Sequence, residues 1–424
     1  MTNQIPVIGT SRNVTITDKK SSSLIGRGLI AIQRKETGLT LSEQDARYRQ
    51  ARDIYNRITD YDMVHRFNTD LLPKQSKQLN LFEVDPLHPF FTMLRQLTDA
   101  FTVFQQLADQ GYGKAYLPLA QMYRGGQGIS QIKDKAKYYF RLAFDWYFAN
   151  RRLNDLEIKL NLGWMYQIGY GVEHDDVQAV FWYRKAAEQG YAVSQCKLGS
   201  MYTQGRGVEH DDVQAVFRYR KAAEQGYVAS QSKLGWMYEQ GRGVTHDIEL
   251  AVFWYRKAAE QGYVLSQCKL GRMYEQGKGV AYDNELAVFW QRKAAAQGYV
   301  TAQSQLGFMY NHGRSVEQDD EQAVFWYRKA AEQGDAFSQK DLGCLYKNGR
   351  GVEQNYEQAV FWFRMAANQC NASAQFNLGL MYCNGNGVEQ DDEQAVFWYR
   401  KAAEQGNNEA QKNLTNRGIN WKDK

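Results

Sequence analysis

Apolar residues recur at helical spacing along most of this chain, in a unit of 36 residues. The unit LGxMYxxGxGVxxDDxQAVFWYRKAAEQGYxxSQxK first appears complete at Leu162. It restarts at Leu198, Leu234, Leu270, Leu306, Leu342 and Leu378. A period of this length is typical of a solenoid, in which each unit buries its apolar face only against its neighbours. The pattern therefore predicts one all-α array, although the length of 424 residues alone would suggest several domains.

Each unit is predicted to form two helices. The first helix, which carries LGxMY, is expected from about Ala192 to Gln204 in one unit, and a turn with two glycines follows it. The second helix, which carries QAVFWYRKAA, is expected from about Asp175 to Gln189, because its apolar residues are spaced at threes and fours. Gly190 is suited to end it in a left-handed conformation. The N-cap position before each second helix holds Asp175, Asp211, Asp247, Asp283, Asp319, Asn355 and Asp391.

The pattern also divides the rest of the chain. Residues 1–22 are polar and are expected to be disordered, and residues 23–59 are expected to form a helical pair that is either a degenerate repeat or an N-terminal cap. Residues 60–88 lack a period, which predicts a linker. Residues 89–406 are predicted to form the solenoid, with about eight helix pairs after a leading half repeat. Residues 407–424 are expected to form a polar capping helix and a tail.

The repeated residues resemble the Sel-one-like repeat family, a branch of the tetratricopeptide superfamily. The resemblance rests on LGxMY, GxGV, AxxWYxKAA and QG at fixed offsets, and it covers roughly residues 101–414. It implies a right-handed α/α solenoid of antiparallel helix pairs that acts as a protein-binding scaffold. The wording of the repeats is similar to that of bacterial members.

Composition narrows the class of function. The net charge is +5, with basic and acidic residues interleaved, which does not favour a nucleic-acid binder. No apolar run approaches the length of a membrane span, and the N-terminus lacks a signal-peptide pattern. The five cysteines are odd in number and irregularly placed, which fits a reducing compartment. We therefore expect a cytoplasmic monomer with a protein or peptide partner and without a cofactor.

One alternative is an enzyme. Three units contain S-x-x-K, at Ser194, Ser230 and Ser266, and this motif supplies the nucleophile of penicillin-binding enzymes. The resemblance extends to cysteine-rich relatives with suggested penicillin binding, so a hydrolase acting on β-lactam or peptidoglycan fragments is the alternative. Against it, the serine position holds alanine in other units, the companion motifs S-D-N and K-T-G are absent, and the paired cysteines of those relatives are missing.

Two further repeated sets each have a structural and a functional interpretation. His174, His210 and His246 stand beside aspartates, but equivalent atoms of neighbouring repeats lie about 10 Å apart, too far for one metal ion. A set of cations on the turns either stabilises helix C-termini or meets an acidic partner. These cations are Arg206, Arg242, Lys278, Arg314 and Arg350.

The first helices differ from one another at three positions, although the second helices are almost identical. One position holds Trp164, Ser200, Trp236, Arg272, Phe308, Cys344 and Leu380; the position three later holds Gln167, Thr203, Glu239, Glu275, Asn311, Lys347 and Cys383; the position four before holds Cys196, Ser232, Cys268, Ser304, Lys340 and Phe376. The three lie within about 60° on the helix, opposite its buried stripe. In the packing that the resemblance implies, this face lines the concave groove.

Aromatic residues and arginine are frequent interface anchors, so the variable face is the predicted binding site. Trp164, Trp236, Arg272 and Phe308 are the predicted anchors. The full predicted set of partner-binding residues is Trp164, Ser200, Trp236, Arg272, Phe308, Leu380, Glu239, Glu275 and Lys347. A second set of repeated aromatics, on the second helices, either forms another contact face or packs beneath Lys and Arg stems. It comprises Phe181, Phe217, Phe253, Phe289, Phe325, Phe361 and Phe397.

Overall fold

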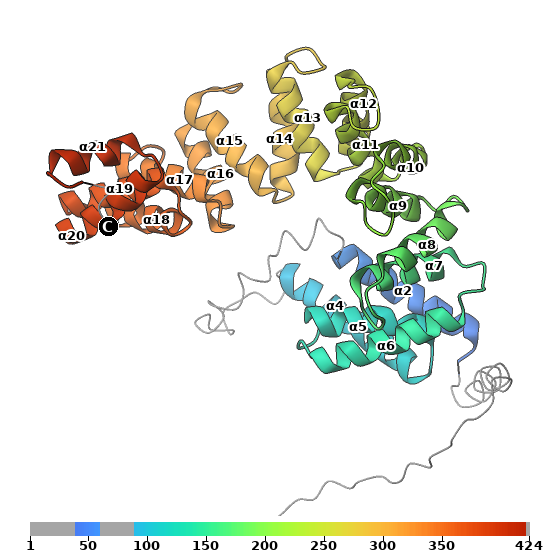
Figure 1. Ribbon diagram of the computed structural model, residues 1–424. Helices are drawn as coiled ribbons and strands as arrows, with labels where there is room; N and C mark the ends of the chain where they lie inside the picture. Colours follow the sequence, from blue (N-terminus) through green and yellow to red (C-terminus); the bar gives the residue numbers. More distant parts are fainter. Residues whose placement is uncertain (1–38, 60–88, 421–424) are drawn as a thin grey trace, which may run out of the picture. The chain divides into compact units, whose positions relative to one another are not determined.

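The computed structural model describes residues 39–59 and 89–420, and every regular element in those ranges is a helix (Figure 1). The chain divides into two compact units, of which the first contains the described residues 39–55 and 89–146 and the second contains the described residues 56–59 and 147–420. The helix expected near residue 23, the disordered segment 1–22 and the linker 60–88 lie outside the described residues.

The first unit begins with α2 (Leu41–Thr59), which covers the second helix of the expected N-terminal pair. It continues with α4 (Pro89–Asp109), the short 3-10 helix η2 (Gly113–Ala115), α5 (Tyr116–Gly125) and α6 (Lys133–Ala149). Aromatic rings join α2 to α4, with the Tyr48 and Phe104 centroids 6.0 Å apart. The Tyr55 hydroxyl donates to Gln127 Oε1 at 2.9 Å, so α2 is also fixed to the turn after α5.

Helix α4 takes the place of a second repeat helix that has no first helix before it. In most of the regular repeats the second glycine of the turn lies against the second helix of the preceding repeat, so that a Cβ on Gly207 would come 2.1 Å from the Asp176 carbonyl oxygen. A Cβ on Gly128 would meet the Leu97 carbonyl oxygen of α4 at 2.7 Å. Both glycines have positive φ and lie 31 positions after the carbonyl that they approach, so α4 is packed as a leading half repeat.

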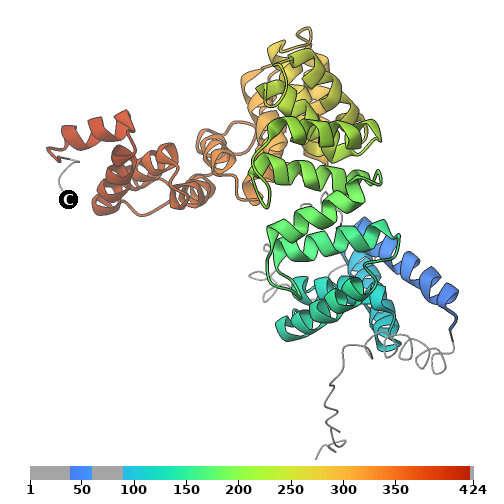
Figure 2. The same cartoon turned by 45° about the vertical axis from the view of Figure 1, so that its right-hand side comes forward.

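The second unit is an uninterrupted series of helix pairs in which each helix packs on the next (Figures 1 and 2). The first helices are α7 (Leu156–Ile168), α9 (Ala192–Gln204), α11 (Val228–Gln240), α13 (Val264–Gln276), α15 (Val300–His312), α17 (Ala336–Asn348), α19 (Ala372–Asn384) and the terminal α21 (Asn408–Asn416). The second helices are α8 (Asp176–Ala187), α10 (Asp212–Glu224), α12 (Ile248–Glu260), α14 (Asn284–Ala296), α16 (Asp320–Glu332), α18 (Tyr356–Asn368) and α20 (Asp392–Glu404). This arrangement confirms the predicted all-α solenoid of antiparallel helix pairs.

The predicted N-caps of the second helices are confirmed in all seven pairs. Asp175 has extended backbone torsions, and its carboxylate accepts the Gln178 N–H at 2.9 Å. The Asp175 N–H donates to the Tyr166 carbonyl at 3.0 Å, near the end of the preceding first helix. The cap therefore satisfies a free backbone donor at the helix start and also fixes the turn between the two helices. The same pair of bonds recurs at Asp211, Asp247, Asp283, Asp319, Asn355 and Asp391.

The core lies between the two helices of each pair and continues into the next pair. Leu198 and Met201 of α9 are fully buried. The core alanines of the second helices, such as Ala179 and Ala186 of α8, are fully buried as well. Gly199 faces the ring of Tyr219, which a Cβ at that position would approach to 2.8 Å. The glycine of LGxMY is thus needed for the close packing of the tyrosine of the following helix.

A relay of glutamine side chains connects consecutive repeats. Gln225, at the end of one second helix, donates to Gln195 Oε1 at 2.8 Å, and Gln195 donates to the Ala187 carbonyl at 3.2 Å. Gln195 is buried, so its amide would be costly without these partners. The same relay recurs between later repeats, which explains why QG and SQ belong to the repeat.

Candidate partner-binding groove

A groove opens along the exposed edges of helices α11 and α13 and encloses about 490 Å³. We call it the α11–α13 groove. Trp236 and Arg272, two of the four predicted anchors, both line it. The other lining residues are Thr203, Gln204, Tyr219, Ser232, Lys233, Met237, Arg242, Tyr255, Tyr263, Leu265, Cys268, Lys269, Tyr299 and Thr301.

Trp236 is the most accessible of the predicted aromatic anchors, with 37% of its surface exposed. The Arg242 guanidinium lies over its indole ring, 5.2 Å from the centroid. This contact holds the ring while leaving an apolar surface open to solvent. Arg272 occupies the equivalent position on the next first helix and is exposed. The groove therefore offers an aromatic surface beside a cation.

The other residues of the same predicted position are half-buried. Trp164 packs against Tyr170, with ring centroids 5.7 Å apart, and Ser200 Oγ lies 3.1 Å from the Tyr219 hydroxyl. Phe308 packs against the core and lies 4.2 Å from the His312 ring. Leu380 is half-buried on α19. Of this set, the structure brings only Trp236 and Arg272 into the α11–α13 groove.

Glu239, a predicted partner contact, is buried in a polar network. Its carboxylate accepts the Tyr255 hydroxyl at 2.7 Å and lies 3.3 Å from both Lys269 Nζ and Lys278 Nζ. Burial opposes its ionisation, but the hydroxyl and the two ammonium groups together hold the pKa of this carboxyl below its usual range. The carboxylate is therefore satisfied within the repeats and has little surface to offer a partner.

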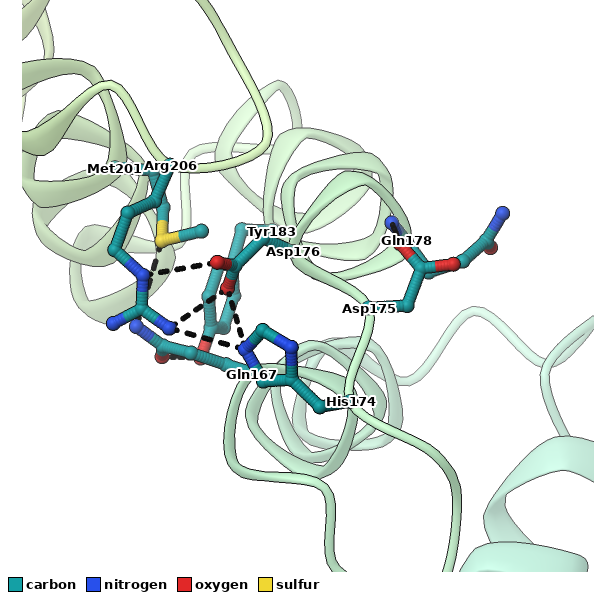
Figure 3. Close-up of polar contacts among 8 residues, drawn as sticks. All are labelled: Gln167, His174, Asp175, Asp176, Gln178, Tyr183, Met201 and Arg206. Atoms are coloured by element: carbon teal, nitrogen blue, oxygen red, sulfur yellow. Dashed lines mark hydrogen bonds and ion pairs between the residues drawn. The ribbon is translucent and has the colours of Figure 1, made fainter.

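Glu275 and Lys347 also have partners within the chain. The buried Glu275 carboxylate lies 3.0 Å from Arg314 Nε and accepts from Gln305 at 3.4 Å. Lys347, which is half-buried, donates to Asn377 at 3.4 Å. These residues occupy the same position of the repeat as Glu239. The position faces the following second helix, as the 2.7 Å bond from the Tyr183 hydroxyl to Gln167 shows (Figure 3).

The cations on the turns have a role that neither sequence interpretation anticipated. Arg206 reaches back to the preceding second helix, and its Nε and Nη2 each lie 2.9 Å from an oxygen of Asp176 (Figure 3). His174 lies beside both groups, 3.2 Å from Arg206 and 3.3 Å from Asp176. We call this ion pair between repeats the turn clasp. The same bidentate pairing joins Arg242 to Asp212 and Arg350 to Asp320.

Lys278 and Arg314 reach different carboxylates because the usual one is missing. Ile248, Asn284 and Tyr356 stand where the other four second helices have an aspartate. Lys278 instead lies beside Glu239, and Arg314 beside Glu275. A sequence signal for this exchange exists, because the glutamates occur only in repeats that lack the aspartate. The third such repeat, with Tyr356, has Lys347 instead of a glutamate, and the next turn has Asn386 in place of the cation. The clasp thus explains the two glutamates at this position.

The S-x-x-K motifs lack the geometry of a nucleophile site. Ser194, Ser230 and Ser266 are fully buried in the helix packing, whereas Lys197 and Lys233 are exposed. A serine that substrate cannot reach cannot be the attacking group. Burial also raises the pKa of Cys268, to about 11, which disfavours its thiolate. All five cysteines lie in the described ranges and are free thiols.

The histidines lie apart from any metal-binding set. Within residues 39–59 and 89–420, no group of three or more His, Cys, Asp or Glu side chains is arranged to hold a metal ion. His174 and His210 instead border turn clasps. In the same ranges, none of the helices combines the length and apolar character that a membrane crossing requires.

The phenylalanines of the second helices are half-exposed, close to 45% in most cases. Phe181 packs edge-on against Trp182 at 5.1 Å, and Lys185 lies 5.5 Å from its ring centroid. Phe253, Phe289, Phe325 and Phe397 have the same two contacts. These contacts fit the interpretation in which lysine stems cover the rings. Because the rings stay half-exposed, the other interpretation, a second contact face, is still compatible with the structure.

The fold and the groove place the chain among the α/α solenoid repeat proteins. The family model of the Sel1 repeat matches residues 114–145, 159–191, 192–227, 228–263, 264–299, 300–335, 336–369 and 372–407. These segments cover more than half of the chain, which therefore belongs to the Sel1 repeat family.

Among the solved structures that are similar to the chain are two bacterial proteins. A protective antigen of uropathogenic Escherichia coli with an SLR fold is 37% identical; the alignment covers 76% of this chain and 77% of that one, with a TM-score of 0.41. A Sel1 repeat protein from Oxalobacter formigenes is 31% identical; the alignment covers 57% of this chain and 96% of that one, with a TM-score of 0.49. No curated protein sequence matches the chain.

Proposed function

We propose that this protein is a non-enzymatic scaffold or adaptor that binds a segment of a protein or peptide partner in the α11–α13 groove. The observation that carries the proposal is the open groove of about 490 Å³ in which the exposed indole of Trp236 lies among four cationic side chains. Aromatic and arginine side chains that are fixed on rigid helices lose little entropy when they bind, which makes them effective anchors.

Membership of the Sel1 repeat family supports a scaffold, because consecutive repeats form an extended surface that is suited to macromolecular partners. The alternative function, a hydrolase of β-lactam or peptidoglycan fragments, requires a reactive serine. The buried hydroxyls of Ser194, Ser230 and Ser266 do not favour it.

The test is affinity capture from the native cell with the full chain as bait, followed by mass spectrometry. Trp236→Ala removes the exposed indole, and Phe397→Ala, a half-exposed ring on a second helix, is the matched control. We expect a partner that the wild type and Phe397→Ala capture and that Trp236→Ala loses. A set of captured proteins that is the same for all three baits would refute binding in this groove.

We further propose that the chain is a cytoplasmic monomer that does not bind nucleic acid. The free cysteines support a reducing compartment, and the interleaved charges, many of them paired in turn clasps, argue against a nucleic-acid surface. Cell fractionation tests the location, and sedimentation velocity tests the monomer.

A further inference from the structure

The charges of the α11–α13 groove are all of one sign. Four cationic side chains line it, namely Lys233, Arg242, Lys269 and Arg272, and no aspartate or glutamate is among its lining residues. Two of the four already have a carboxylate partner, because Arg242 pairs with Asp212 and Lys269 shares Glu239 with Lys278. The remaining two, Lys233 and Arg272, therefore decide which charge the groove would attract.

Lys233 and Arg272 form no ion pair within the part of the chain that the structure describes. Lys233 is exposed, and its ammonium lies 5.7 Å from the centroid of the Tyr219 ring. Arg272, on α13, is exposed and lines the groove. An unpaired cation that borders a concave surface raises the local potential and attracts anionic groups.

The cations and the apolar surface follow a regular arrangement. Lys233 lies three residues before Trp236 on α11, and Lys269 lies three residues before Arg272 on α13, so each pair shares one helix face. Leu265, 37% exposed, adds apolar surface to the same groove. The groove thus presents an apolar centre with positive charge on neighbouring helices.

Comparison of the repeats shows that this character is local. The position of Lys233 holds lysine at 197, 233 and 269, and then Gln305, Asp341 and Asn377. The potential ligand site is therefore confined to the repeats around α11 and α13, and an acidic side chain appears two repeats later. A long polyanion would require a continuous basic track, which the array does not have.

We infer that the groove binds an acidic segment of a protein in an extended conformation, with carboxylates at Lys233 and Arg272 and an apolar side chain on Trp236. This inference rests on the proposed function and specifies its ligand. Helices α11, α13 and α15, at about 10 Å spacing, span about 20 Å, which corresponds to about six residues of extended chain.

The test selects ligands without presupposing their sequence. A library of random dodecapeptides displayed on phage is panned against the full chain, and the enriched peptides are synthesised and measured by fluorescence anisotropy. We expect enrichment of Asp and Glu around an apolar residue. Lys233→Glu with Arg272→Glu should weaken binding at least about 10-fold, and so should replacement of the peptide's acids by amides.

The matched control reverses two charges on the second helices of the same repeats, with Lys257→Glu and Lys293→Glu. Both lysines are exposed, and this variant should change the affinity less than about twofold. Circular dichroism melting of both double variants shows whether they fold. If Lys233→Glu with Arg272→Glu does not fold, Lys233→Gln with Arg272→Gln is measured in its place.

The possible failures can be told apart. Neutral or basic peptides that still require Trp236 would overturn the acidic ligand and keep the groove as a binding site. Peptides whose binding ignores Trp236→Ala, or a library without enrichment, would overturn the proposed function as well. Tighter binding of a twelve-residue oligothymidylate than of any peptide, lost in Lys233→Glu with Arg272→Glu, would replace the acidic protein segment by a nucleic acid.

Discussion

The Lys278 ammonium lies 3.3 Å from the carboxylate of Glu239 in the preceding repeat. The equivalent cation of an earlier repeat, Arg206, instead pairs with Asp176, at the start of a second helix. In the repeat that has Ile248 in place of this aspartate, Glu239 of the first helix supplies the carboxylate. The cation of the next turn, Lys278, lies beside it. The contact between repeats is thus preserved by two different pairs of residues, and both Glu239 and Glu275 belong to the exchanged form.

The first prediction concerns Glu239→Gln. This substitution removes the buried carboxylate that Lys269 and Lys278 share. The loss of one partner from such a network typically costs about 1–3 kcal/mol of stability. We expect a loss of this size in the free energy of unfolding at pH 7, measured with urea. Glu260→Gln, at an exposed position of the next second helix, is the control and should change little.

The pH dependence of the same variant follows from the direction of the pKa shift. The pKa of Glu239 is lowered in the folded protein from its ordinary value of 4.5. Its ionised form therefore contributes stability that is complete above that value and is lost as the pH falls through the lower, folded pKa. The difference between wild type and Glu239→Gln should shrink below about pH 4. A difference that is constant from pH 7 to pH 3 would show that the charge of Glu239 does not matter.

The second prediction separates two of the sequence-predicted anchors. Trp236 is exposed in the groove, whereas Phe308 packs on the core of its repeats. Trp236→Ala should leave the melting temperature almost unchanged and weaken the binding of the captured partner by roughly 2 kcal/mol. Phe308→Ala should lower the melting temperature and change affinity less. Melting curves and binding isotherms on the same preparations check both, and the reverse pattern would assign Phe308 rather than Trp236 to the partner.

The fold could be predicted from the sequence because every repeat carries the same local signals. The N-cap aspartates, the glycine after each helix and the apolar stripes depend on neighbours within one helix pair, and the periodicity extends them along the array. The variable face was harder to interpret. Variation at Trp236 leaves a side chain exposed, but variation at Glu239 accompanies the loss of an aspartate in the adjacent helix. The pattern along one helix cannot show that the glutamate replaces the aspartate of another helix, because the clasp joins residues 30 or 39 positions apart.

The third prediction concerns a strained turn. Cys370 has a φ of 63°, at the position where the other repeats have a glycine such as Gly334, with a φ of 94°. A side chain in the left-handed region costs about 1–2 kcal/mol, of which the higher entropy of an unfolded glycine cancels a part. Cys370→Gly should therefore stabilise the protein by about 0.5–1 kcal/mol in urea unfolding. Gly334→Ala is the reverse exchange and should destabilise it; a loss of stability in both variants would contradict the strain at Cys370.

The last prediction concerns the end of the array. Ala410 and Leu414 of α21 are fully buried against Tyr399 and Ala402 of the last complete repeat. Removal of the chain from Asn407 onward would expose this apolar surface, and terminal repeats of solenoids are kept soluble by a polar outer face.

We expect the truncated chain to aggregate, or to lose its last repeat at a lower temperature than the wild type does. Leu414→Ala should reproduce the early transition without shortening the chain, because deletion of a buried leucine side chain costs about 2–5 kcal/mol. Lys412→Ala, at an exposed position of the same helix, is the control. Light scattering and thermal unfolding measure both effects. A truncated chain that remains monodisperse and melts like the wild type would show that α21 does not cap the array.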